Sequence, residues 1–217
     1  MSLISENLER IRASIGNAQL IAVSKTVPPE SVDEALAAGQ LLFGESKVQE
    51  AKAKIPVVSG RARWHMVGHL QSNKARDAVA LFEMIHSVDS VSLATELNKW
   101  ADRAGKTQAI LLEVNVSGEV SKFGLKPEDV EGVLTQINAL PRVEVRGLMT
   151  VPPAGKDARP FFRQLREMRD RLGLTELSMG MSHDYEAAVA EGATMVRIGT
   201  AIFGERLVRR SFSEGGT

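Results

Sequence analysis

The sequence predicts a single α/β domain in which eight parallel strands close into a (β/α)8 barrel. Short apolar runs alternate with longer amphipathic stretches along nearly the whole chain, a pattern typical of successive βαβ units. About eight such repeats occur, whereas the alternative fold, an open doubly wound sheet, more often has about five or six strands. The 217 residues suit one barrel domain, and no linker divides the chain.

The predicted strands are short apolar runs that lie between polar or turn-forming segments. They are expected at Gln19–Val23, Leu41–Phe43, Arg63–Val67, Phe82–His86, Ala109–Val116, Val143–Thr150, Glu176–Met179 and Met195–Ile198. Helices are expected to follow them at Pro29–Ala38, Ser46–Lys54, Asn73–Leu81, Val91–Ala104, Pro127–Ala139, Asp157–Leu172 and Asp184–Glu191, with a short turn from Thr200. The pair Pro28 and Pro29 suits a helix start, because proline fits the first helical turn.

The two ends of the chain carry different patterns. Leu8, Ile11 and Ile15 recur at helical spacing, which predicts an N-terminal helix within residues 1–17. This segment lacks the basic stretch and long apolar run of a signal peptide. The tail from Arg209 to Thr217 is polar and contains two successive glycines, so it is expected to be frayed.

Composition argues against several classes of function. Basic and acidic residues each number 27, so the net charge is zero and no global field favours nucleic acid or anionic membranes. The absence of cysteine excludes disulfides, thiolate zinc sites and cysteine nucleophiles. No stretch approaches the length of about 18 apolar residues that a membrane span needs. The expected location is the cytoplasm.

Lys25 directly follows the first predicted strand, at the end where barrels of this kind gather their active groups. With an ordinary pKa of about 10.4, only about one lysine in a thousand is neutral near physiological pH. Burial or a nearby cation lowers that pKa and supplies the neutral amine that Schiff-base chemistry needs. The alternative is a lysine that only extends along the barrel rim with its charge in water.

The loops after the seventh and eighth strands resemble a phosphate site. Such loops, together with a helix start, often bind phosphate in barrels. The amides of Gly199 and Thr200 can donate to phosphate oxygens, and Ser182 adds a hydroxyl from the neighbouring loop. The alternative is that Gly199 only fits a tight barrel corner. A lysine and a phosphate cradle in one mouth would together suit a phosphorylated aldehyde.

Arg197 lies within an otherwise apolar strand and, because it stays charged, needs partners there. Pairing with Glu45 or Glu113 is the structural alternative, and donation to a ring atom of a ligand is the functional one. The four histidines form neither a His-x-His nor an HExxH pair, so no metal site is expected.

These residues belong to longer stretches that resemble one known family. The stretches are Ala22–Thr26, Trp64–Lys74, Val114–Ser117 with Ser121, Lys122 and Gly124, and Ser178–Asp184 with Met195–Gly204. Together they resemble the pyridoxal-phosphate homeostasis proteins, a family of barrels that bind pyridoxal 5′-phosphate (PLP). The resemblance spans nearly the whole chain, from about Leu20 to Gly204, and the motifs together are highly specific.

The resemblance implies a PLP barrel of fold type III, like the N-terminal barrel of alanine racemase but without its second β-domain. It implies that Lys25 is the Schiff-base lysine, that Ser182, Gly199 and Thr200 contact the phosphate, and that Arg197 faces the pyridine nitrogen. An arginine there disfavours protonation of that nitrogen, because two positive centres would meet. The ring is then a weaker electron sink, which suits a carrier better than a versatile catalyst.

Three more residues complete the predicted set of cofactor contacts: Ser46, Asn115 and Met149, which lie near the ends of the second, fifth and sixth strands. Ser46 marks a departure from the resembling family, which often has Gly-Glu-Asn where this chain has Gly44, Glu45 and Ser46. Serine is shorter and has no amide group, so it cannot make a ring contact that the asparagine amide would carry.

The resemblance therefore implies a PLP carrier in vitamin B6 and amino-acid homeostasis without catalytic turnover. PLP-dependent apo-enzymes are the candidate recipients, and a monomer is expected. A racemase-like PLP enzyme is the alternative function, and a cofactor-free Schiff-base aldolase is a third. Racemisation needs a second acid or base on the opposite face, which a second-domain tyrosine provides in the resembling racemases. The sole tyrosine here, Tyr185, follows the seventh strand near the phosphate end and is expected to pack against a helix.

Overall fold

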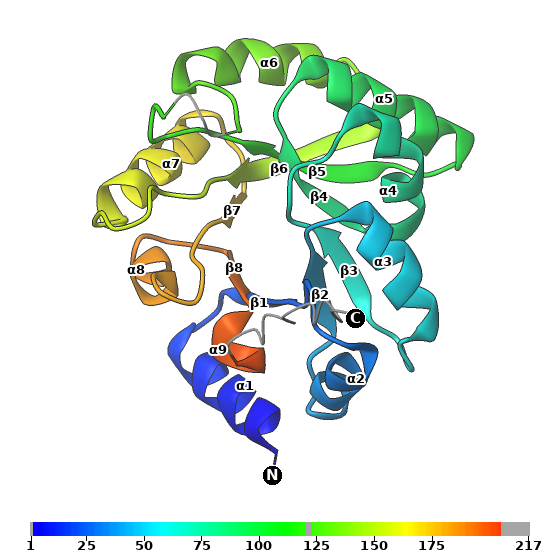
Figure 1. The fold of residues 1–217 in the computed structure, drawn as a ribbon. Coiled ribbons are helices and arrows are strands. Elements are labelled where there is room, and N and C mark those ends of the chain that lie inside the picture. The colour runs from blue at the N-terminus through cyan, green and yellow to red at the C-terminus, as the bar shows by residue number, and fades with distance from the viewer. Residues whose placement is uncertain (1, 120–122, 205–217) are drawn as a thin grey trace, which may run out of the picture.

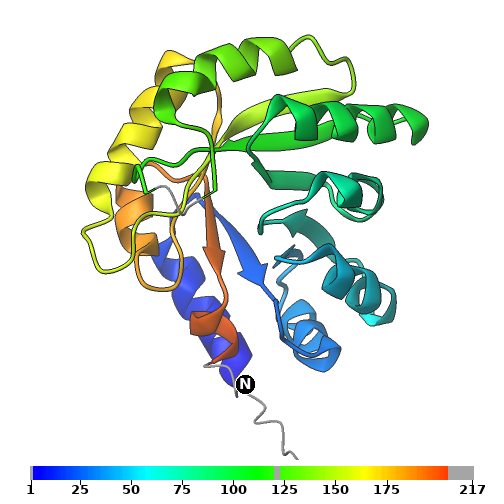
Figure 2. The same cartoon turned by 45° about the horizontal axis from the view of Figure 1, so that its top comes forward.

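The computed structural model describes residues 2–119 and 123–204. The tail predicted to be frayed, 209–217, and Ser121 and Lys122 of the family-like stretches lie outside the described residues. The strands form one closed parallel barrel in chain order, in which β1 (Gln19–Val23) pairs with β8 (Met195–Ile198). Helices surround the barrel (Figure 1, Figure 2). The predicted closed barrel is confirmed, and the alternative of an open doubly wound sheet is wrong.

Each predicted element is present in the structure, with ends that differ by a few residues. The other strands are β2 (Leu42–Glu45), β3 (Arg63–Met66), β4 (Met84–Val88), β5 (Gln108–Glu113), β6 (Val143–Met149) and β7 (Glu176–Ser178). The helices are α1 (Leu3–Ser14), α2 (Pro29–Ala37), α3 (Val48–Lys54), α4 (Ala75–Leu81), α5 (Val91–Arg103), α6 (Val130–Ile137), α7 (Arg159–Arg171), α8 (Tyr185–Ala190) and α9 (Thr200–Phe203). Short 3₁₀ turns lie at Ile55–Val57, Ser72–Lys74 and Pro127–Asp129.

The shifted boundaries have local hydrogen-bonding causes. β4 begins after Phe82 because the Phe82 amide donates to the Ala78 carbonyl and closes α4. β5 ends at Glu113 because the chain then pairs with Leu125, whose amide donates to the Glu113 carbonyl. α7 begins at Arg159 because its amide donates to the side chain of Asp157 at 3.1 Å. Apolar periodicity identifies the elements but does not report these terminal bonds.

Apolar side chains form two separate clusters, one on each side of the barrel wall. The larger one, here called the outer apolar cluster, fills the space between the strands and the surrounding helices. The smaller cluster lies inside the barrel and comprises Ile21, Leu42, Met84, Ala109, Leu111, Met149 and Met195. Alternation along β5 separates the two, because successive strand residues point to opposite faces. No described helix combines the length and the apolar composition that crossing a membrane requires.

Gly147 marks an irregular position in the barrel wall. Ile110 pairs with Val145 but Leu111 pairs with Gly147, so β6 carries one extra residue at this point. A Cβ atom on Gly147 would lie 2.0 Å from the backbone carbonyl oxygen of Glu176 in β7. Because that neighbour is backbone, two strands would have to separate to admit a side chain.

We expect Gly147→Ala to lower the free energy of unfolding by about 1–3 kcal/mol, the usual cost of overpacking. Chemical denaturation of the purified variant measures this loss. The matched control is Gly132→Ala in α6, where no atom lies within 4 Å of the added Cβ apart from its chain neighbours and the backbone of its own helix. That change should be neutral or stabilise by up to about 1 kcal/mol, because alanine favours a helix over glycine. Equal stability of the two variants would contradict the argument.

Candidate ligand-binding site

A cavity of about 490 Å³ opens at the carboxyl ends of the strands. Its volume lies within the range of about 300–1,000 Å³ that is usual for small-molecule sites. The lining includes the six predicted residues Lys25, Ser46, Ser182, Arg197, Gly199 and Thr200. These residues come from opposite ends of the sequence and meet because β1 and β8 are neighbours in the barrel. A larger hollow of about 870 Å³ shares Val151, Met181 and His183 with this cavity.

Lys25 lies in a tight turn directly after β1. The Ser24 amide donates to the Gly44 carbonyl at 3.0 Å, which extends the pairing with β2 by one residue. The Val27 amide then donates to the Ser24 carbonyl at 2.9 Å and closes the turn. Thr26 has a φ of 63°, which is uncommon for a β-branched residue and therefore strained. The Thr26 amide donates to Oε1 of Glu50, which helps to hold this conformation.

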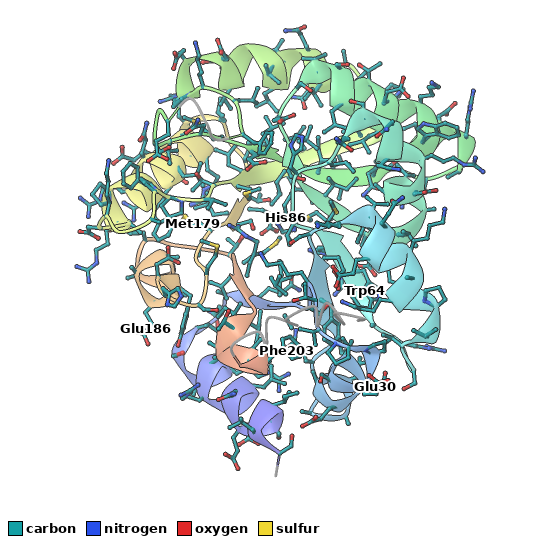
Figure 3. The ribbon with its side chains drawn as sticks, in the orientation of Figure 1. Glu30, Trp64, His86, Met179, Glu186 and Phe203 are labelled. Atoms are coloured by element: carbon teal, nitrogen blue, oxygen red, sulfur yellow. The ribbon has the colours of Figure 1, made fainter. Side chains whose placement is uncertain are left out.

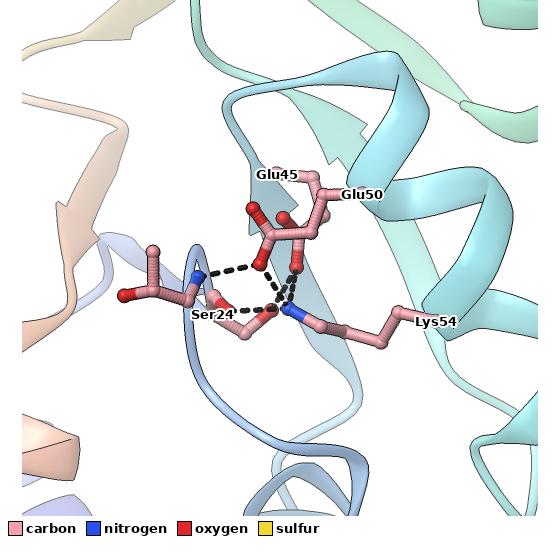
Figure 4. Close-up of polar contacts among 5 residues, drawn as sticks. Ser24, Glu45, Glu50 and Lys54 are labelled. Atoms are coloured by element: carbon pink, nitrogen blue, oxygen red, sulfur yellow. Dashed lines mark hydrogen bonds and ion pairs between the residues drawn. The ribbon is translucent and has the colours of Figure 1, made fainter. Parts of the chain in front are cut away.

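A buried lysine beneath this turn connects it to α3. Nζ of Lys54 lies 2.6 Å from the Ser24 carbonyl oxygen, 2.7 Å from Oε1 of Glu45 and 2.8 Å from Oε1 of Glu50 (Figure 4). The Ser24 hydroxyl also donates to Oε1 of Glu45 at 2.7 Å. The exposed fractions of the Lys54 and Glu45 side chains are only 5% and 0%. Burial raises the pKa of Glu45, and hydrogen bonds from Lys54 and Ser24 oppose that rise.

This cluster argues against one structural alternative for Arg197, which is pairing with Glu45. β2 extends to Glu45, whose carboxylate bonds to Lys54 and is absent from the described lining of the cavity. Burial also raises the pKa of Glu113, to about 7, and the charge of Arg197 opposes that rise. The described hydrogen bonds of the Arg197 guanidinium go to Ser178 and Thr150, so neither of the expected carboxylates is its direct partner.

The loops after β7 and β8 meet at the start of α9. Thr200 and Ala201 open this helix, so their amides have no acceptor within it. The Ala201 amide donates to the Ser182 hydroxyl at 3.3 Å, which places Ser182 at the same helix end. A Cβ on Gly199 would lie 2.9 Å from the Val23 carbonyl oxygen. Close packing against β1 therefore accounts for a glycine at this position, whatever its amide binds.

A chain of polar side chains crosses the barrel interior behind Arg197. Nη1 of Arg197 donates to the Ser178 hydroxyl at 2.6 Å, and Nη2 donates to the Thr150 carbonyl at 2.8 Å. Nδ1 of His86 lies 2.8 Å from the same hydroxyl, and Nε2 of His86 lies 3.0 Å from Nδ1 of His65. Figure 3 shows His86 near the centre of the barrel. The chain thus joins strands β3, β4, β7 and β8.

Sequence reasoning did not identify the two interior histidines as parts of the site. Trp64 and Met66 belong to the outer apolar cluster, so His65 between them must face the barrel interior. His86 follows Ile85 of the outer cluster and faces inward for the same reason. The alternation on β3 and β4 was therefore an available signal. No comparable pattern indicated that Lys54 is buried, because a lysine in a predicted helix is usually exposed to solvent.

Asn115 and Met149 are absent from the described lining of the cavity. The Asn115 side chain donates to the Glu119 carbonyl at 2.8 Å and accepts from the Ser117 hydroxyl at 2.8 Å, which orders the loop after β5. Met149 is 1% exposed and belongs to the apolar cluster inside the barrel. Their predicted contacts with a cofactor stay predictions.

The fold and the cavity define an α/β-barrel protein of the alanine racemase N-terminal class. The family model described as alanine racemase, N-terminal domain, matches residues 1–207. The chain is 44% identical to the pyridoxal phosphate homeostasis protein of Aquifex aeolicus, over 94% of this chain and 96% of that protein. It is 43% identical to the protein of the same name from Pseudomonas aeruginosa, over 95% of this chain and 97% of that protein. The chain belongs to the family of pyridoxal phosphate homeostasis proteins.

Solved structures agree with this assignment. PipY of Synechococcus elongatus, described with PLP bound, has a TM-score of 0.85 and 43% identity, over 93% of this chain and 100% of that one. Its structure without PLP has a TM-score of 0.87. The alanine racemase of Corynebacterium glutamicum has a TM-score of 0.71 at 19% identity, over 96% of this chain and 62% of that one, a likeness of fold alone.

Proposed function

We propose that this protein binds pyridoxal 5′-phosphate through Lys25 and acts in PLP and amino-acid homeostasis. The observation that carries the proposal is that Lys25 and the start of α9 line one cavity. An amine and an anion-binding helix end in the same cavity can hold a molecule that carries both an aldehyde and a phosphate. Relatives named for PLP homeostasis and a related structure described with PLP bound support this assignment.

The donor set of the cavity fits PLP. Lys25 brings an amine, Arg197 brings a cationic group, and Ser182 and the amides at the start of α9 bring hydrogen-bond donors. Such a set complements an anionic ligand with ring and phosphate acceptors. When bound, PLP supplies an aldehyde that condenses with a lysine amine and releases one water molecule.

Each residue has a separate role in this proposal. Lys25 forms the covalent link, and the turn that contains it fixes where its side chain enters the cavity. Ser182 and Thr200, together with the Gly199 backbone, hold the phosphate. Arg197 donates to the pyridine nitrogen and disfavours its protonation, because two positive charges would then lie side by side. Donors at both ends of the ligand therefore fix its orientation.

A carrier is favoured over a racemase by the position of Tyr185. Its hydroxyl lies 3.3 Å from the Ser14 hydroxyl of α1, and its ring packs against the outer apolar cluster. Tyr185 is absent from the described lining of the cavity, where a racemase would need its second acid or base. We place this carrier in the cytoplasm as a monomer, with PLP-dependent apo-enzymes as its candidate recipients.

The test compares PLP with pyridoxal, which has the aldehyde but lacks the phosphate. We expect one PLP per chain to become irreversibly attached on borohydride reduction, with the added mass on the peptide that contains Lys25. Pyridoxal should bind at least about 100-fold more weakly than PLP, because several charge-assisted hydrogen bonds of about 1.5–3 kcal/mol each are lost. Titration followed by absorbance measures both affinities. Equal affinity would show that the α9 end does not bind phosphate.

A further inference from the structure

The guanidinium of Arg197 is anchored on one side by the barrel wall. Arg197 is 5% exposed, and its two described hydrogen bonds run from different nitrogens to acceptors on different strands. Thr150 offers a backbone carbonyl, whose position the fold fixes. Ser178 offers a hydroxyl, which can rotate and can donate as well as accept. The orientation of Arg197 therefore depends on what holds the Ser178 hydroxyl.

His86 is the group that holds this hydroxyl. Because the Ser178 oxygen accepts from Arg197, its own proton is free to point at Nδ1 of His86, 2.8 Å away. Burial lowers the pKa of His86 well below its ordinary value, so its ring is neutral at pH 7. A neutral imidazole has one acceptor and one donor. If Nδ1 accepts from Ser178, Nε2 must carry the ring proton.

His65 completes the chain by accepting that proton. Nε2 of His86 lies 3.0 Å from Nδ1 of His65, and burial lowers the pKa of His65 to about 4, so this ring is also neutral. The reverse direction of the chain would leave the Ser178 proton without an acceptor among the described residues. We assign the direction in which Ser178 donates, because its hydroxyl then accepts from Arg197 and donates to His86, and this direction corresponds to the Nε2–H tautomer of His86.

We propose that His65, His86 and Ser178 form a positioning relay that orients Arg197 toward the ring nitrogen of the bound cofactor. This inference rests on the proposed function, because it assigns a role in binding PLP to residues that do not line the cavity. The three residues act through Arg197 and are positioning residues. The relay keeps the remaining guanidinium donors directed at a ring acceptor, so that the ring nitrogen stays unprotonated.

The test uses two disruptive variants and one conservative variant. Ser178→Ala removes the hydroxyl that Arg197 and His86 share. His86→Leu removes the acceptor of that hydroxyl. His86→Gln retains one acceptor and one donor and should restore the relay in part. Circular dichroism and thermal melting show whether each variant folds.

The first measurement uses the protein without cofactor and so does not depend on PLP binding. The side-chain Nε–H NMR signal of Arg197 should have a high order parameter in the wild type and in His86→Gln. It should be clearly lower in Ser178→Ala and His86→Leu, because the guanidinium loses its anchor. An unchanged order parameter in Ser178→Ala would overturn the relay. This outcome is separate from failure of the proposed function, in which the wild type would not bind PLP.

The second measurement uses protein loaded with PLP that carries ¹⁵N in its ring. In Ser178→Ala and His86→Leu the dissociation constant of PLP should rise about 10-fold. The ¹⁵N shift should report protonation of the ring nitrogen at a pH about one unit higher than in the wild type. If His86→Leu does not fold, Ser178→Ala decides the question by the same measurements. Equal impairment of His86→Leu and His86→Gln would show a packing role and would also overturn the relay.

Discussion

Replacing Lys25 by alanine should abolish the covalent attachment of PLP. The alanine variant lacks the amine that bonds to the aldehyde, so borohydride reduction should leave no added mass on the chain. The phosphate contacts at the start of α9 do not involve this side chain, so weaker, reversible binding should remain. Mass spectrometry of the reduced protein measures the covalent fraction, and equilibrium dialysis measures the reversible one.

Two control variants separate covalent chemistry from charge and from solvent-exposed lysines in general. Lys25→Arg keeps a positive charge in the turn, but a guanidinium stays protonated and is not a nucleophile at neutral pH. It should lose the adduct as completely as the alanine variant. Lys52→Ala changes a side chain on α3 that is 63% exposed, and should keep full attachment. A full adduct on the Lys25→Ala chain at another residue would assign the covalent role elsewhere.

The sequence predicted the barrel well because its signal is repeated eight times. Each apolar run and each amphipathic stretch is local, and every strand end places its polar residues at the same edge of the sheet. This is why Lys25 and Thr200 could be assigned to one cavity although they lie near opposite ends of the sequence. The strand boundaries were less predictable, as Phe82 shows, because single hydrogen bonds at helix ends decide them.

The hydrogen-bond partners inside the barrel were predicted less completely. They depend on the register between neighbouring strands as well as on the alternation of inward and outward side chains along each strand. Pairing of Arg197 with Glu45 or Glu113 was the structural alternative to a ligand contact, because charge is the partner signal that a sequence offers. The structure instead gives Arg197 the neutral acceptors Ser178 and Thr150. The Glu45 carboxylate at the end of β2 instead accepts a hydrogen bond from Lys54 at the end of α3, the helix that follows β2.

Replacing Lys54 by methionine should strongly destabilise the fold. The methionine stem fills similar space, but Glu45 is left with a buried charge and the Ser24 carbonyl loses a donor. Removing one partner of a buried ion pair costs about 3–5 kcal/mol. With about 2–4 °C per kcal/mol for a domain of this size, Tm should fall by about 6–20 °C. Thermal unfolding followed by circular dichroism measures the shift.

A lysine on the same helix that is exposed to solvent shows how much of the expected loss is due to the burial of Lys54. Lys52→Met lies on the same helix, and its ion pair with Asp77 is exposed to solvent. Its cost should be within about 0.5 kcal/mol, as for most exposed pairs. Adding Glu45→Gln to Lys54→Met should recover part of the loss, because no unpaired buried charge then remains. An unfolding free energy of the single variant within about 1 kcal/mol of the wild type would contradict the assigned role.

The pH dependence of Lys54→Met follows from the direction of the Glu45 pKa. Burial already raises that pKa in the folded state, and loss of the lysine removes the hydrogen bond and the charge that oppose the rise. A carboxyl whose pKa is higher in the folded than in the unfolded state holds its proton more tightly when folded, so its ionisation destabilises the fold as pH increases. The variant should therefore lie closest to the wild type below the ordinary glutamate pKa of about 4.3 and fall further behind as pH rises toward neutrality. A gap that widened toward acid pH would mean that Glu45 is not the group left unpaired, and the strained turn at Thr26 would then be the first place to look for the lost stability.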